Sequence, residues 1–210
     1  GGLGGVGLKI AKWLASCGAQ HLVLIGRRGV HSTEIAQKVQ AIRDTGVKVI
    51  IASADVEHEQ SIASIISNIN QNLPPLRGVI HSVMTMDASL LIKMTPQQLK
   101  KVMNPKILGA WNLHVCTLGL NLDFFLMFSS FASVVGSVGL AHYSAANCFL
   151  DSLAYYRKTI GLPATSISWG VIGDTGYFKH HEHARKNLEA EGFLSLSFIQ
   201  ICKAIKWGVD

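Results

Sequence analysis

Four residues are of types that move protons in enzymes, and their spacing could bring them together. Tyr143 and Asn147 lie four positions apart, which places them on one face of a helix. Ser130 ends an apolar run, and Lys106 lies earlier, in the segment NPKILGAW. A tyrosine with its ordinary pKa of about 10 handles protons poorly at neutral pH, and a nearby ammonium lowers that pKa. The set predicts an acid–base site, although each residue alone also fits a structural role: a cap, a solvated lysine or a half-buried tyrosine.

A glycine-rich start, GGLGGVG, precedes a helix-like stretch and indicates a phosphate-binding turn. Glycines allow a tight turn and a close backbone approach to a pyrophosphate, and the following helix N-terminus attracts the anion. A flexible glycine turn is the alternative interpretation. The residues expected to contact the pyrophosphate are Gly1, Gly2, Leu3, Gly4, Val6 and Gly7.

Two arginines follow the next strand-like run, where a dinucleotide's adenosine ribose would lie. Arg27 and Arg28 stand at a position where an acidic residue would favour a free 2′-hydroxyl, and arginine favours a 2′-phosphate. The pair therefore predicts NADPH rather than NADH, the alternative being a solvated basic turn. Asp55 and Val56, after the third run, are expected to contact the adenine, although Asp55 could equally be a helix N-cap.

The elements that must position these residues alternate between strand-like and helix-like stretches. We expect strands at residues 21–25, 47–52, 78–83, 124–130 and 164–169, and helices at 6–17, 32–44, 58–71, 96–118 and 141–160. Continuous apolar strands fit a parallel sheet that helices cover on both faces. The fold class is therefore α/β, a Rossmann-like doubly wound sheet. A strand is also expected before Gly1, central in the sheet and missing from this fragment.

Composition supports a globular domain and excludes several classes of protein. Of 210 residues, 49% are apolar and 15% charged, which excludes a disordered chain. The net charge of +6 permits an acidic partner or a phosphate-rich ligand. The four cysteines form no zinc or disulfide pattern, which favours a reduced, cytoplasmic location. No apolar run is long enough to span a membrane.

The ordered motifs of the chain carry a family resemblance. They are GGLGGVG, HLVLIGRRG, ADV, PLRGVIHSV, NPKILGAWNLH, DFFLMFSSFASVVGSVGLAHYSAANCFLDSLAYYRK and GLPATSISWG. Together they resemble the ketoreductase domain of a type I polyketide synthase or an animal-type fatty acid synthase, in the short-chain dehydrogenase/reductase superfamily. Free-standing members usually carry lysine four residues after the tyrosine. Asn147 and Lys106 instead match the synthase arrangement.

The resemblance implies roles for these residues. Tyr143 would donate a proton to the ketone oxygen, Ser130 would hydrogen-bond that oxygen, and Lys106 and Asn147 would complete the network. NADPH would reduce a 3-oxoacyl thioester on an acyl carrier protein to the 3-hydroxyacyl thioester. The partners would be that carrier protein and neighbouring synthase domains, with no nucleic acid, metal or membrane insertion. After the fourth expected strand, the cofactor would also contact His81, Ser82 and Val83.

Departures from the family pattern leave alternatives open. Met84 stands where the family usually has a glycine close to the cofactor. Its bulk favours a catalytically silent scaffold domain if it crowds the nicotinamide, and a small loop shift would accommodate it otherwise. A stand-alone carbonyl reductase is a third hypothesis. Met86, Asp87 and Ala88 keep only the middle residue of a Leu-Asp-Asp marker, and the opposing tryptophan marker is absent, so the product configuration stays open.

The last residues differ in texture from the rest. We expect residues 1–175 to form the catalytic domain and 176–210 a lid or C-terminal helical element of the same domain. His180, His181 and His183 invite a metal interpretation, but a solvated lid face fits their charged surroundings better. The amphipathic run 196–207 is expected to pack against protein rather than a membrane.

Overall fold

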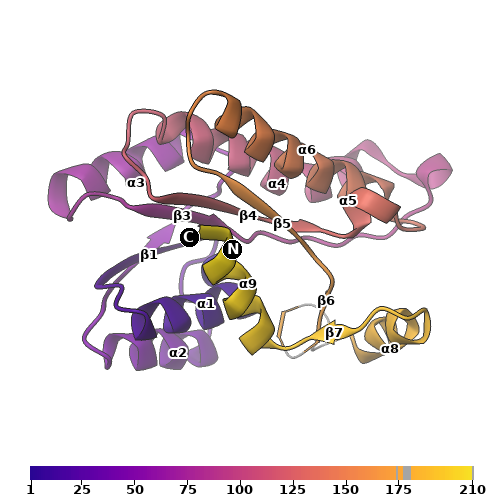
Figure 1. Ribbon diagram of the computed structural model, residues 1–210, viewed down its shortest axis with the longest axis horizontal. Helices are drawn as coiled ribbons and strands as arrows, with labels where there is room; N and C mark the ends of the chain where they lie inside the picture. Colours follow the sequence, from indigo (N-terminus) through magenta and orange to yellow (C-terminus); the bar gives the residue numbers. More distant parts are fainter. Residues whose placement is uncertain (174, 177–180, 210) are drawn as a thin grey trace.

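Two groups of parallel strands lie between two layers of helices in the computed structural model, which describes residues 1–173, 175–176 and 181–209 (Figure 1). One group pairs β1 with β2, and the other has the order β3-β4-β5. The strands are β1 (His21–Gly26), β2 (Lys48–Ser53), β3 (Gly78–His81), β4 (Phe124–Ser130), β5 (Thr165–Trp169), β6 (Val171–Ile172) and β7 (Ser195–Leu196). The expected α/β fold with parallel sheets is confirmed.

Helices cover both faces of the strands. Helices α3, α4, α5 and α6 lie above them in Figure 1, and α1, α2 and α9 lie below. Their bounds are α1 (Gly5–Ser16), α2 (Thr33–Arg43), α3 (Glu59–Asn72), α4 (Pro96–Cys116), α5 (Ala132–Val135), α6 (Ala141–Thr159), α8 (Glu182–Ala190) and α9 (Phe198–Val209), with a 3-10 turn, η1, at Leu91–Lys93. The expected helices differ from these by one or two residues at their ends, while η1, α5, β6 and β7 were not foreseen.

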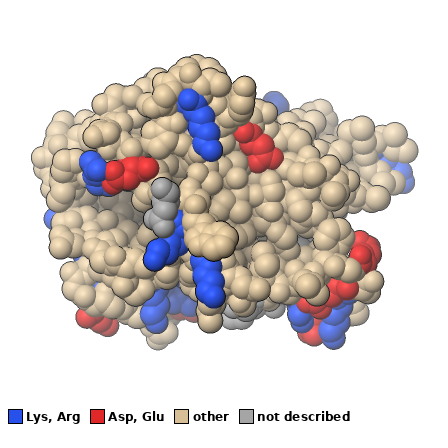
Figure 2. Space-filling model, in the orientation of Figure 1, with Lys and Arg blue, Asp and Glu red and all other residues tan. Residues whose placement is uncertain are grey.

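The two strand groups face each other without pairing. No hydrogen bond joins β1 to β3 in the described chain, and residues of both strands line a cavity of about 510 Å³ between them. Figure 2 shows the surface hollowed to the left of its centre, in this region. A central strand before Gly1 would lie here and stays a prediction. Such a strand would satisfy the open backbone edges of both groups.

Apolar side chains on each face of β4 hold the layers together. Phe125 and Met127 are fully buried in the cluster under α3, α4 and α6, which includes Ile62 and Leu150. The alternate residue Leu126 faces the opposite cluster, under α1 and α9. This double burial explains why the strand reads as a continuous apolar run rather than an alternating one.

The C-terminal element packs onto the domain through its last helix. Ile201 and Ile205 of α9 are at most 1% exposed and share a cluster with Ile10 of α1 and Leu126 of β4. Strand β6 pairs with β7, so the expected boundary at residue 175 falls between paired strands. Helix α8 buries none of its residues.

The histidine cluster gives no support to a metal site. His181 and His183 are exposed, and His180 lies outside the described residues. Among the residues the structure describes, no group of three His, Cys, Asp or Glu side chains could hold a metal ion. None of the described helices is long and apolar enough to cross a membrane.

Candidate active site

Ser130 and Tyr143 lie together at the carboxyl edge of the β3–β5 group. Ser130 is the last residue of β4, and Tyr143 is in the first turn of α6; each is 7% exposed. The Ser130 Oγ accepts a hydrogen bond from the Ala132 amide at 3.3 Å, which fixes its direction. The carboxyl ends of parallel strands are where ligands of such folds bind.

Lys106 reaches this pair from α4. Its side chain is 1% exposed, and Nζ lies 5.5 Å from the centre of the Tyr143 ring. Nζ donates a hydrogen bond to the Phe128 carbonyl of β4 at 2.7 Å. Burial lowers the pKa of this ammonium to about 7, and the Asp151 carboxylate acts in the opposite direction. A lysine with a pKa near neutrality can change its charge during catalysis.

The pKa of Tyr143 differs from expectation. Burial raises it above its usual value, and side-chain hydrogen bonding with Ser130 and Asn147 works only partly against this. The expectation that the lysine lowers the tyrosine pKa is therefore wrong for this structure. Desolvation dominates, and the lysine hydrogen bond goes to the Phe128 carbonyl. A raised pKa keeps the phenol protonated, which is the form that can donate a proton.

Asn147 completes the cluster on the same face of α6. It is fully buried, and its Nδ2 donates to the Tyr143 carbonyl at 2.8 Å. Its Oδ1 has no hydrogen-bond partner within the described residues. A buried amide oxygen without a partner carries a desolvation cost, so it is suited to accept a hydrogen bond from a bound water or ligand.

The glycine turn has the close packing that a phosphate cradle requires. The Gly4 amide donates to the Gly1 carbonyl at 3.0 Å, and α1 begins at the next residue. A Cβ on Gly7 would lie 2.2 Å from the Gly1 carbonyl oxygen, so this position excludes any side chain. The first turn of α1 contains no acidic residue, which leaves its N-terminus favourable for an anion.

A groove of about 1150 Å³ begins at this turn and passes most of the residues expected to bind a cofactor. Those that line it are Gly1, Leu3, Gly4, Val6, Gly7, Arg27, Arg28, Asp55, Val56, Ser82 and Val83. The size, the glycine turn and the two arginines fit a dinucleotide.

Two of the expected cofactor residues, Gly2 and His81, lie outside the groove lining. The Gly2 amide donates to the Ile25 carbonyl at 3.2 Å, so this glycine serves close packing against β1. His81 is 2% exposed and lies beneath α4, where a Cβ on Gly109 would come within 2.9 Å of its ring. Their assignment to direct cofactor contact is corrected for this reason.

The alternative role of Asp55 as a helix N-cap is also settled by geometry. The N-cap of α3 is His58, whereas Asp55 Oδ1 accepts from the Glu57 amide at 3.1 Å in the preceding turn. Sequence reasoning did not assign the groove residues Thr85, Met86, Pro105, Thr175 and Gly176. The first two could have been found, because they follow β3 at the carboxyl edge.

The two arginines occupy the turn that follows β1. Both are exposed, and neither forms an ion pair within the described part of the chain. The Ser53 Oγ donates to the Arg27 carbonyl at 3.2 Å and ties this turn to β2. The guanidinium groups are therefore available to an anionic ligand in the groove.

Two buried histidines should make the protein less stable in acid. Burial lowers the pKa of His81 to about 3, and burial together with the Arg157 charge lowers the pKa of His114. Below pH 6.5 the unfolded chain binds protons at these rings that the folded state refuses. The free energy of unfolding should fall with decreasing pH by up to about 1.4 kcal/mol per pH unit for each histidine.

Denaturant unfolding between pH 6.5 and 5 measures this effect. His81→Gln should flatten the slope, whereas replacement of the exposed His183 with asparagine should leave it unchanged. A free energy of unfolding that stays constant across this window would contradict the prediction.

Comparisons with known proteins agree with the site. A family model described as "KR domain" matches residues 1–174. The chain is 34% identical to the highly reducing polyketide synthase phiA of a fungal species over 100% of its own length, and spans 8% of that relative. It is 36% identical to the polyketide synthase Pks15/1 of phenolphthiocerol synthesis in Mycobacterium marinum, over 88% of this chain and 9% of that protein.

A solved structure gives the same result. A structure of A-type ketoreductases from a modular polyketide synthase matches with a TM-score of 0.93 and 36% identity, over 100% of this chain and 44% of that one. Ketoreductase domains of this kind use a nicotinamide cofactor. The chain belongs to the ketoreductase-domain family of polyketide synthases, within the short-chain dehydrogenase/reductase superfamily.

Proposed function

We propose that the chain catalyses NADPH-dependent reduction of a 3-oxoacyl thioester, carried by an acyl carrier protein, to the 3-hydroxyacyl thioester. The observation that carries this proposal is the buried Lys106–Ser130–Tyr143–Asn147 cluster at the carboxyl strand edge. The carrier protein and neighbouring synthase domains are the proposed partners, because the relatives are much longer polyketide synthases.

The proposed chemistry divides the reduction between cofactor and protein. When bound, NADPH supplies a hydride to the β-carbon of the thioester. The Tyr143 hydroxyl donates a proton to the ketone oxygen, and the Ser130 hydroxyl hydrogen-bonds the same oxygen as its charge develops. Lys106, 5.5 Å from the tyrosine ring, stabilises the phenolate left behind. Asn147 presents its free Oδ1 to water that returns a proton.

Cofactor choice is the part of this proposal that the arginine turn supports. Replacing Arg27 and Arg28 with alanine should weaken NADPH binding by about tenfold or more, because each charge-assisted hydrogen bond contributes roughly 1.5–3 kcal/mol. NADH lacks the 2′-phosphate, so its affinity should change far less.

Fluorescence titration with both cofactors measures the difference. The matched control is Arg43→Ala, since Arg43 binds the Val49 carbonyl on β2 and does not line the groove. Equal weakening of NADPH and NADH binding by the double substitution would remove the argument for the phosphate.

Met84 supports a second candidate, a silent scaffold domain. Its side chain is 42% exposed and lines the groove, where the family usually has glycine. Oxidation of NADPH by a 3-oxoacyl thioester, followed at 340 nm, separates the two functions. Turnover supports the reductase; cofactor binding without turnover, which Met84→Gly then restores, supports the scaffold.

A further inference from the structure

The connecting segment between β3 and η1 forms one wall of the site although it has no regular secondary structure. Met84, Thr85 and Met86 line the nucleotide groove. Met86 also packs, together with Leu140, against the small cluster that contains Tyr143. Met86 therefore lies between the groove and the tyrosine ring, in the region where a ketone must be held.

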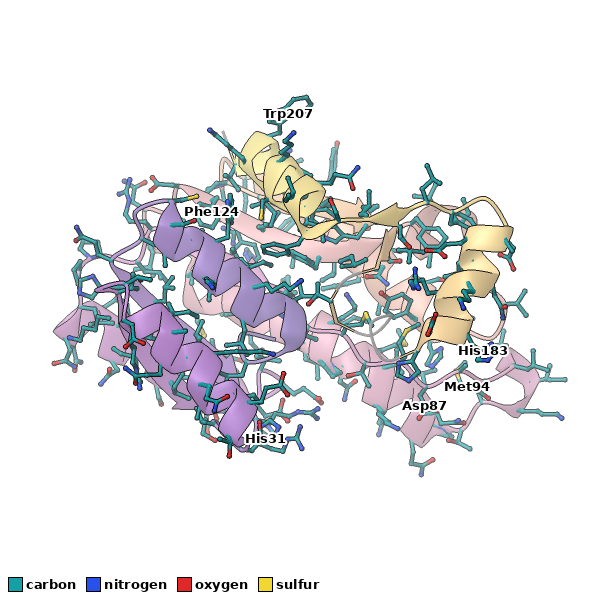
Figure 3. The ribbon with its side chains drawn as sticks, turned by 90° about the horizontal axis from the view of Figure 1, so that it is seen from below. His31, Asp87, Met94, Phe124, His183 and Trp207 are labelled. Atoms are coloured by element: carbon teal, nitrogen blue, oxygen red, sulfur yellow. The ribbon has the colours of Figure 1, made fainter. Side chains whose placement is uncertain are left out.

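Asp87 fastens this segment to α4. Its Oδ2 accepts from Lys101 Nζ at 2.8 Å, and its Oδ1 accepts from Gln98 Nε2 at 3.3 Å. Figure 3 shows Asp87 beside this helix. The Asp87 side chain is 23% exposed, so the ion pair is partly shielded from water. The adjacent capping box between Thr95 and Gln98 fixes the helix start that supplies these donors.

Two further hydrogen bonds fasten the segment to the other side of the site. The Asp87 carbonyl oxygen lies 2.9 Å from His142 Nε2, and since a carbonyl only accepts, this nitrogen carries the proton. His142 immediately precedes Tyr143 and is 3% exposed. The Ser89 amide donates to the Gly139 carbonyl at 2.9 Å. The segment is therefore held from α4 and from the start of α6 at once.

We propose that Met86 is a specificity-determining residue that contacts the substrate beside Tyr143, and that Asp87 and His142 are positioning residues that hold it there. This inference rests on the proposed ketone reduction. A segment without a strand or helix ladder is free to move unless side chains fix it. Charge-assisted hydrogen bonds supply that constraint here.

The position of Met86 predicts which thioesters are accepted. When the ketone oxygen meets the Tyr143 hydroxyl, the carbons on either side of it lie next to the neighbours of Tyr143, among them Met86. A methyl branch on the carbon between ketone and thioester competes with the methionine for this space. The protein should therefore prefer 3-oxoacyl thioesters without that branch.

Met86→Ala tests the contact. The ratio of kcat/KM for a 2-methyl-3-oxoacyl thioester to that for its unbranched counterpart should rise about tenfold, in the range that one methyl group commands in an enzyme pocket. The control is Met94→Ala, a methionine after η1 that does not line the groove. An unchanged ratio in Met86→Ala would overturn the assignment.

Asp87→Asn and His142→Phe test the positioning role. Both should lower kcat/KM for the unbranched thioester about tenfold, because small misplacements of reacting groups cost this much or more. Amide hydrogen exchange at residues 84–89 should accelerate, while NADPH affinity stays within a factor of two. Lys101→Met should reproduce the effect and Lys101→Arg, which keeps the cation, should not.

A matched ion pair elsewhere serves as control. Asp123→Asn removes the exposed pair with Arg77 at the start of β4, far along the strand from Ser130, and should change neither readout. Unchanged exchange and kinetics in Asp87→Asn would overturn the positioning role. If the wild type reduces neither thioester, the proposed function fails, and the exchange measurement still decides whether Asp87 holds the segment.

Discussion

Tyr143→Phe should lower the rate of ketone reduction by about 10²- to 10⁴-fold, the usual contribution of a positioned proton donor. The substitution removes one oxygen atom from a ring that is 7% exposed, so the surrounding packing should survive. Steady-state NADPH oxidation with a 3-oxoacyl thioester measures the loss. NADPH affinity and the unfolding midpoint should stay unchanged, because the ring still fills its place.

The same helix offers a matched control for this substitution. Tyr155 is on α6 and 73% exposed, so Tyr155→Phe should retain the wild-type rate. A Tyr143→Phe variant that turns over at the wild-type rate would contradict the assignment of the proton donor.

Lys106→Met should lower kcat/KM by about 10²-fold and remove a pH dependence near neutrality. In the wild type the protonated lysine stabilises the phenolate, and burial places its pKa at about 7. The rate should therefore decline as the pH rises through 7, as the ammonium loses its proton. In Lys106→Met this decline should be absent, because no group remains to titrate.

Stability measurements separate catalysis from folding in this variant. Replacing a buried charge with an apolar side chain of similar length is often neutral or stabilising. Lys106→Met should thus fold, and Lys100→Met, at an exposed position of the same helix, should keep both the rate and the pH profile. Retention of the wild-type pH profile in Lys106→Met would show that another group titrates.

Periodicity and residue type sufficed to predict the regular elements. The runs that became β1 to β5 are apolar over their length because helices cover both faces, and this pattern is visible without coordinates. The two-residue strands β6 and β7 carry no such pattern. They form because Val171 and Ile172 meet Ser195 and Leu196 from a distant segment.

The candidate site was predictable in its members but not in its electrostatics. Types and spacing identified Ser130, Tyr143 and Asn147. The path of Lys106 to the Phe128 carbonyl depends on how α4 packs against β4, which no local pattern encodes. Burial then reversed the expected shift of the Tyr143 pKa. The contacts of Asp87 with Lys101 and His142 were equally invisible, because they join three separate elements.

The central claim is that this cluster directs hydride to the β-carbon of a 3-oxoacyl thioester. Incubation of the protein, with the predicted strand before Gly1 restored, with NADPH carrying deuterium at the transferred position tests it directly. Mass spectrometry of the thioester should find a 3-hydroxyacyl product with one deuterium on the β-carbon, and Tyr143→Phe should form it at least about 10²-fold more slowly. Bound NADPH with no deuterium in any acyl product would contradict the account.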